Sequence, residues 1–142
     1  QFEDYREILN MVDYIFLNFK KIDINKAKIY FCDGNHEQHL LLKELELEYG
    51  WETPIEIKEN LFYCPRGCSL EMKDGRRVLF AGGADSIDKQ WREEGINWFS
   101  QETMKYSDYE RIDFSKTYDI VVSHTCSLNC MAHMKELYKG TC

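Results

Sequence analysis

The fold is decided by a short apolar segment and the turn that follows it, Ile29-Tyr30-Phe31-Cys32-Asp33-Gly34-Asn35-His36-Glu37. The first four residues are apolar and predict a short buried strand. Gly34 permits a tight exit from that strand, which brings Asn35 and His36 to its carboxyl end. Ligands of open α/β sheets bind outside the carboxyl ends of the strands. The stretch therefore predicts an α/β protein with a functional site at this turn.

A second apolar segment ends in the same way. Tyr118-Asp119-Ile120-Val121-Val122 predicts another strand, and Ser123 and His124 follow it. Asparagine offers a neutral amide oxygen, and histidine offers an imidazole that acts as a metal ligand or a proton donor. Each residue type also has a plainer explanation, because asparagine is common in turns and histidine can simply end a strand. Two strands that deliver Asn35, His36 and His124 to one rim favour a metal site.

Three pieces of this sequence resemble the calcineurin-like metallophosphoesterase family. Gly34-Asn35-His36-Glu37 matches the family's G-N-H-[DE] turn, and His124 stands where the family has a later histidine at a strand end. The stretch Gly82-Gly83-Ala84-Asp85-Ser86-Ile87-Asp88, followed by Trp91-Arg92, is similar to the segment between these motifs in a bacterial and phage-like branch. The pieces occur in the family's order, and the resemblance covers most of the chain.

The resemblance implies hydrolysis of phosphate esters at a pair of divalent metal ions. Asn35 and His124 would bind the same ion, and His36 would donate a proton to the leaving-group oxygen. Manganese, iron and zinc all suit mixed nitrogen and oxygen ligands. The fold implied is a four-layer α/β/β/α sandwich of two mixed sheets. Phosphomonoesterases, phosphodiesterases and nucleases share this core, so the resemblance does not select one substrate.

Arg92 has two interpretations. Its planar guanidinium suits a bidentate contact with a phosphate oxygen pair, which would make it a substrate-binding residue. Its spacing from Asp88 is four residues, and a carboxylate and a guanidinium at that spacing usually form an ordinary ion pair on a helix face. The spacing favours the ion pair.

Other motifs of the family do not occur in the sequence, namely an upstream D-x-H, an upstream G-D-x-x-D and a downstream G-H-x-H. We therefore expect residues 1–142 to form a single, partial metallophosphoesterase-like domain, the central piece of a longer enzyme. By itself the chain is expected to bind metal weakly and to lack appreciable phosphoesterase activity, because two neutral ligands do not offset the loss of ion hydration. The alternative is a catalytically incomplete fragment or interaction module that keeps the fold without the chemistry.

Composition restricts the partners and the compartment. The chain has 142 residues, of which 44% are hydrophobic and 14% aromatic, as expected for one globular domain. Its formal net charge is −7 and it has no stripe of Lys and Arg, so nucleic acid is expected only as a substrate. An apolar run of about 18 residues and a signal-peptide layout are both missing from the sequence, which predicts neither a membrane span nor secretion. We expect a cytoplasmic protein whose partner is a phosphate ester.

The cysteines allow a second kind of site. Cys64 and Cys68 are separated by three residues, as are Cys126 and Cys130, and four thiolates could in principle bind zinc. The usual zinc knuckle has two intervening residues instead. Reduced, free thiols are therefore the favoured interpretation.

Hydrophobic periodicity and turn residues predict alternating elements. Asp74-Gly75 is a strong signal for a hairpin turn. Pro54 forbids regular pairing at its own nitrogen, so residues 51–60 are predicted to be a connecting stretch. The pattern predicts helices at residues 3–21, 37–49, 88–94 and 130–138, a further short helix from residue 100, and strands at residues 29–32, 61–63, 69–72, 78–81 and 119–122.

Overall fold

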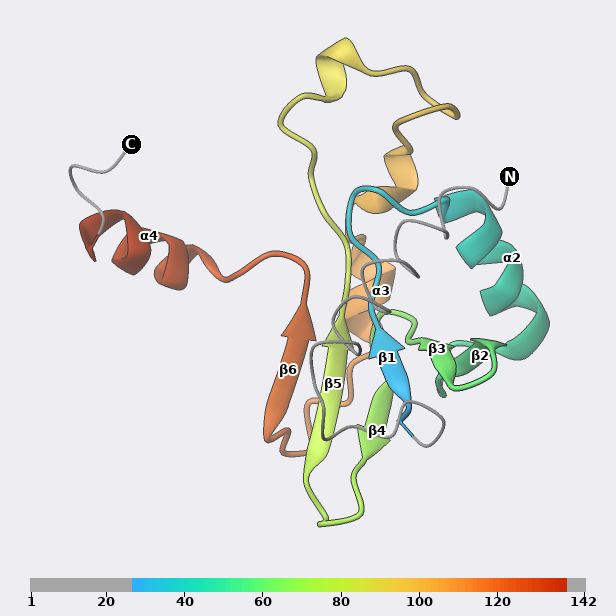
Figure 1. Cartoon of the computed structure of the whole chain (residues 1–142). Helices are drawn as coiled ribbons and strands as arrows, with labels where there is room; N and C mark the ends of the chain where they lie inside the picture. Colours follow the sequence, from blue (N-terminus) through green and yellow to red (C-terminus); the bar gives the residue numbers. More distant parts are fainter. Residues whose placement is uncertain (1–26, 138–142) are drawn as a thin grey trace.

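The computed structural model describes residues 27–137, which form two three-stranded sheets and several helices (Figure 1). This arrangement confirms the mixed α/β class. The helix predicted for residues 3–21 lies outside the described residues.

The first sheet has the strand order β1-β3-β2, with β1 at Ile29–Phe31, β3 at Leu61–Tyr63 and β2 at Ile55–Lys58. β1 runs parallel to β3, and β2 runs antiparallel to it. The sequence prediction missed β2, because residues 51–60 were expected to be irregular. Two isoleucines alternate with charged residues along this strand, as expected when only one face is buried. Pro54 stands just before the strand, where its missing N–H removes nothing from the ladder.

The second sheet has the order β4-β5-β6, with β4 at Ser69–Glu71, β5 at Arg77–Ala81 and β6 at Ile120–Ser123. β4 and β5 form the predicted hairpin, and Gly75 in its turn has a φ of +85° that glycine adopts without strain. β5 and β6 pair in parallel, so both end at the same rim of the sheet. These are the strands that the sequence predicted, with bounds that differ from the prediction by one residue.

The two sheets pack face to face, and helix α2 (His39–Tyr49) covers the first sheet. Leu42 of this helix packs on Ile55 and Tyr63 of the first sheet. The core between the sheets is formed by apolar side chains from both, namely Cys64, Cys68, Val78 and Phe80 with Tyr30, Cys32, Leu70, Ile120 and Val122 around them. Helix α4 (Leu128–Leu137) follows β6 and extends away from both sheets (Figure 1). The described residues therefore show two sheets packed on each other, with α2 against the first sheet.

The segment between β5 and β6 contains only short helical turns. It includes the 3-10 turns η1 (Lys89–Trp91) and η2 (Ser100–Glu102) and the short helix α3 (Tyr106–Glu110). The helix predicted for residues 88–94 is thus only the single turn η1, and α3 was not predicted. In Figure 1 this segment rises beyond the carboxyl end of β5 and then returns beside the sheets.

Arg66 holds this segment against the end of β1. Its side chain is only 2% exposed and donates from Nε to Oδ2 of Asp33 at 3.0 Å and from Nη1 to Oδ2 of Asp108 at 3.1 Å. It also donates to the backbone carbonyls of residues 101–103. Burial opposes a charge on Arg66, but the two carboxylates outweigh it, so the pKa of Arg66 is raised above its ordinary value. Arg66 is therefore the central cation of a buried charge network.

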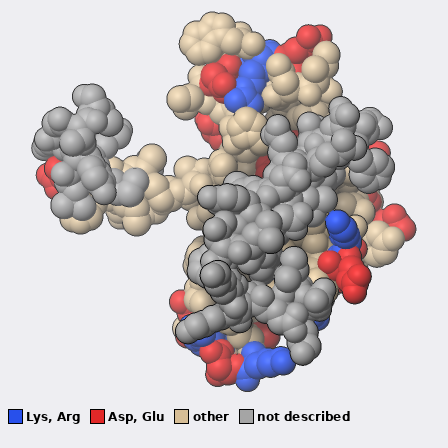
Figure 2. Space-filling view, in the orientation of Figure 1, with Lys and Arg blue, Asp and Glu red and all other residues tan. Residues whose placement is uncertain are grey.

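Surface charge is mixed on the face drawn in Figure 2. Lys and Arg lie among Asp and Glu, and the described residues of this face form no continuous basic stripe. Within residues 27–137, none of the helices is both long enough and apolar enough to cross a bilayer.

Candidate functional site

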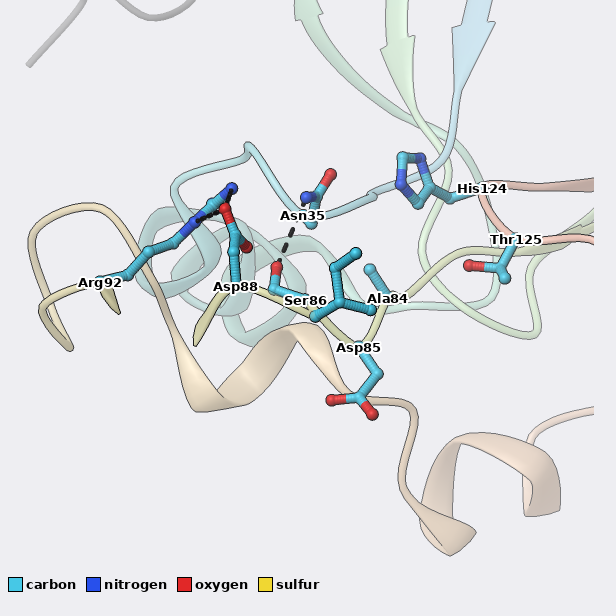
Figure 3. A pocket seen from close by; sticks show the side chains of 9 residues that line it. Asn35, Ala84, Asp85, Ser86, Asp88, Arg92, His124 and Thr125 are labelled. Atoms are coloured by element: carbon cyan, nitrogen blue, oxygen red, sulfur yellow. Dashed lines mark hydrogen bonds and ion pairs between the residues drawn. The ribbon is translucent and has the colours of Figure 1, made fainter. Parts of the chain in front are cut away.

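Asn35 and His124 line the same pocket, although they follow strands of different sheets. Asn35 comes after β1 of the first sheet, and His124 comes directly after β6 of the second. The pocket has a volume of about 320 Å³, and Figure 3 shows both side chains at its wall. The structure therefore brings these two predicted ligands to one rim by packing one sheet on the other, not by pairing their strands.

The imidazole of His124 lies directly over the backbone of Gly34. A Cβ atom built on Gly34 would come within 2.7 Å of Cε1 and 2.8 Å of Cγ of that ring. Real Cβ atoms do not approach other atoms so closely, so only glycine leaves room for the ring. Gly34 thus leaves space for His124 beside Asn35, whereas its backbone does not adopt the left-handed angles that favour glycine.

A second glycine joins the exit of β5 to the exit of β1. A Cβ atom on Gly82 would lie 2.8 Å from the backbone oxygen of Asp33, and the N–H of Gly83 donates to the same oxygen at 2.9 Å. This contact brings the residues that follow Gly83 close to the turn that carries Asn35. Ala84, Asp85, Ser86 and Asp88 consequently form the opposite wall of the pocket (Figure 3).

Asn35 is held by a hydrogen-bond chain that the sequence did not reveal. Its Nδ2 donates to the hydroxyl of Ser86 at 3.4 Å, and that hydroxyl donates to Oε2 of Glu102 at 3.0 Å. The backbone N–H of Ser86 donates to Oε1 of the same carboxylate at 2.5 Å. Ser86 is 5% exposed and Glu102 is 0% exposed. No local sequence signal marks Glu102, because its partner lies in a loop that only the tertiary structure brings near.

His36 lies beside Asn35 but lines a different cavity. This cavity has a volume of about 170 Å³ and is also lined by Asn35, Glu37, Ile96 and Phe99. Oε2 of Glu37 accepts from the backbone N–H groups of Gly34 at 2.7 Å and of His36 at 3.2 Å, which stabilises the turn. The His36 side chain is exposed, so it is accessible to a solvent-borne ligand.

Arg92 lines the pocket and also forms the ion pair that its spacing predicts. Its Nε and Nη2 donate to Oδ2 of Asp88 at 2.9 and 2.8 Å, and its Nη1 donates to the carbonyl of Asn97 at 3.3 Å. The guanidinium lowers the pKa of the Asp88 carboxyl below its ordinary value. Arg92 therefore gives the pocket a cation, but one whose charge is already shared with a carboxylate.

The described residues fit part of a metal site. An amide oxygen and an imidazole at one pocket wall are suitable ligands for a borderline divalent ion. Figure 3 shows the Asn35 amide nitrogen turned toward Ser86, with its oxygen turned away from Ser86. Residues 27–137 contain no group of three or more His, Cys, Asp or Glu side chains placed to hold an ion. Asn35 and His124 are therefore two candidate ligands at one pocket.

The four cysteines considered for zinc do not come together. Cys64 and Cys68 are fully buried between the sheets, whereas Cys126 and Cys130 are exposed. A hydrogen bond with Cys68, together with burial, raises the pKa of the Cys64 thiol. The buried pair is thus part of the apolar core, in agreement with the favoured interpretation of free thiols.

Comparison of the chain with models of known protein families, with curated proteins and with solved structures gave no match.

Proposed function

We propose that this chain carries part of the active site of a metal-dependent phosphoesterase built on a four-layer α/β/β/α sandwich. In this proposal Asn35 and His124 hold one divalent ion, manganese, iron or zinc, of a two-metal centre. Metal ions at such a centre neutralise the phosphate and lower the pKa of a bound water. His36 would protonate the departing oxygen, and Arg92 would contact a phosphate oxygen from the other wall.

One observation supports the proposal above the others: Asn35, His124 and Arg92 come from three separate parts of the chain and line one pocket. Two potential ligands and a cation are the groups that a phosphate ester with its metal ion requires. Asp85 and Asp88 also line this pocket, but within residues 27–137 no three or more His, Cys, Asp or Glu side chains are grouped to hold an ion. We therefore propose a shared site, to which other residues contribute anionic ligands.

Mn²⁺ binding to the 142-residue chain tests the ligand assignments. We expect weak binding that is lost in Asn35→Ala and in His124→Ala, because each substitution removes one of two ligands. His36→Ala should bind Mn²⁺ like the parent chain, since a proton donor to the leaving group is not a ligand. His133→Ala, at an exposed position on α4, is the matched histidine control. Electron paramagnetic resonance of free Mn²⁺ gives the dissociation constants.

The outcomes separate the proposal from its competitors. Equal binding by all five proteins would show that Asn35 and His124 are not ligands. Loss of binding in His36→Ala would make His36 a ligand and remove it as the acid. Robust, chelator-sensitive hydrolysis of an aryl phosphate by the chain alone would show that the chain supplies its own anionic ligands, and Asp33, Asp85 and Asp88 would be the first residues to substitute. Mn²⁺ binding at Asn35 and His124 in a longer protein that includes the anionic ligands, but that hydrolyses no phosphate ester, would favour the interaction module.

A further inference from the structure

We propose that Glu102 and Ser86 are positioning residues that determine which end of the Asn35 amide faces the pocket. This inference rests on the proposed function in one respect, namely that the Asn35 oxygen is a metal ligand. An asparagine side chain has a donor end and an acceptor end of nearly equal size. Only the oxygen end can coordinate a cation, so the orientation of the amide decides whether Asn35 binds metal at all.

Glu102 determines which group donates and which accepts in each of these hydrogen bonds. As a carboxylate, Glu102 only accepts hydrogen bonds, and its two oxygens accept from the backbone N–H and the hydroxyl of Ser86. Because Glu102 is 0% exposed, water does not compete for these oxygens. The Ser86 hydroxyl therefore donates its single proton to Glu102 and has none left to donate to Asn35.

Ser86 in turn determines which end of the Asn35 amide faces it. With its proton committed, the Ser86 hydroxyl has only lone pairs left, so it must accept from whatever lies next to it. The neighbour is the Asn35 amide, whose Nδ2 lies 3.4 Å away. The amide nitrogen thus faces Ser86 and the oxygen faces away (Figure 3). If the amide were reversed, two acceptors would face each other.

Glu102→Gln keeps the size of the side chain but reverses the donor and acceptor roles in the hydrogen bonds that link residue 102, Ser86 and Asn35. The Ser86 backbone N–H needs an acceptor, so the new amide oxygen takes the place of Oε1 and its NH₂ group faces the Ser86 hydroxyl. Ser86 then accepts from Gln and its own proton becomes free to donate to Asn35. This favours the reversed Asn35 amide, which presents NH₂ to the pocket. Outer partners of metal ligands typically change metal affinity by about 10- to 100-fold.

The Mn²⁺ affinities of the parent chain and four variants test the proposal. We expect Glu102→Gln to lower the affinity by about 10-fold or more, toward the value for Asn35→Ala. Ser86→Ala should lower it by less, because it frees the amide to rotate without reversing it. Glu46→Gln is the matched control: Glu46 is another buried carboxylate, bound to Tyr63, Lys43 and Arg111 on the α2 side of the first sheet, and its substitution should leave the affinity unchanged.

A rescue experiment separates positioning from a general loss of structure. Aspartate at position 35 has two equivalent oxygens, so its coordination does not depend on which way it is turned. In the Asn35→Asp background, Glu102→Gln should cause no loss of Mn²⁺ affinity. A loss as large as in the parent background would overturn the proposal, since it would mean that Glu102 acts by supporting the fold.

Side-chain NMR of the metal-free protein gives a second readout. The Asn35 NH₂ signals should shift in Ser86→Ala and in Glu102→Gln and stay in place in Glu46→Gln; unchanged signals in the first two would overturn the proposal. Shifted signals together with Mn²⁺ binding that Asn35→Ala does not affect would keep the positioning role and reject the metal role of Asn35. If Glu102→Gln fails to fold, Ser86→Ala and its NMR spectrum still decide the question.

Discussion

Among single residues, His39 has the least ordinary environment of the described histidines. It is the first residue of α2, only 2% exposed, and its Nδ1 lies 3.8 Å from Oδ2 of Asp33. Its Nε2 is buried without a hydrogen-bond partner among the described residues. Burial lowers the pKa of His39 below its ordinary value; the charge of Asp33 opposes this effect and that of Arg66 adds to it. Glu37 and Glu102 also face the ring and oppose the lowering.

We predict that this histidine makes the protein less stable as the pH falls below about 6.5, the ordinary histidine pKa. In the unfolded chain His39 takes up a proton at a higher pH than in the folded protein. The free energy of unfolding therefore falls through this window, by at most about 1.4 kcal/mol per pH unit for one proton. His39→Gln should flatten the dependence between pH 7.5 and pH 5.5, measured by urea unfolding. His133→Gln, at an exposed position, should not; an unchanged slope in His39→Gln would contradict the prediction.

Among the elements, the exits of β1 and β5 are the most tightly constrained. Gly82 is in contact with Asp33, and no left-handed backbone angle is required at Gly82. Gly75 is the opposite case, with a φ of +85° and no atom within 4 Å of the position that a Cβ would occupy. Glycine is therefore required at position 82 because a Cβ atom has no space there, and it is favoured at position 75 because of the backbone angle.

We predict that Gly82→Ala costs about 1–3 kcal/mol of unfolding free energy, because the added methyl group forces the two strand exits apart. Gly75→Ala, where only backbone strain is introduced, should cost about 1 kcal/mol. Urea unfolding at pH 7 gives both values. If Gly82→Ala proves the milder change, the strand exits have room that the structure does not show.

Elements with local signals were predicted from the sequence, and elements without them were not. Gly50 ends α2 with a φ of +86°, and Gly75 forms the hairpin turn. Each of these conformations depends on the glycine and the residues next to it, so a short stretch of sequence is enough to predict it. β2 was missed because Pro54 outweighed the alternation that follows it. Glu102 could not have been found, because its role depends on Ser86 and on burial, which arise only when distant segments pack. The same holds for Arg66, whose carboxylate partners lie 33 and 42 residues away.

At the scale of the whole molecule, Arg66 joins the first sheet to the segment that carries Glu102. Burial raises the pKa of Asp108, but the backbone N–H of Lys105 and the guanidinium of Arg66 outweigh it, so this pKa lies below its ordinary value. Asp108 therefore stabilises the fold above about pH 4, its ordinary pKa, and this contribution is lost as the pH falls through the lowered value.

We predict that Arg66→Ala lowers the unfolding free energy by about 3–5 kcal/mol at pH 7, because it leaves Asp33 and Asp108 buried without their cation. Arg66→Lys should lose less, since it keeps a charge but not the fork geometry. Arg111→Ala is the control: Glu46 would keep its contacts with Lys43 and Tyr63, so the loss should be smaller. The deficit of Arg66→Ala should shrink below pH 4; a deficit independent of pH would mean that packing, and not charge, is lost.

Because Asn35 follows the first described strand and His124 the last, the pocket closes only after nearly all of the structure between them is in place. Contacts so distant in sequence form slowly and late in folding. During synthesis the amino-terminal part of a chain emerges first, so a nascent chain on the ribosome would expose Asn35 long before His124 became available to it. Any ion held jointly by these residues would then be acquired only after His124 had emerged and the two sheets had packed, and metal supply would act on the folded domain and not on the early nascent chain.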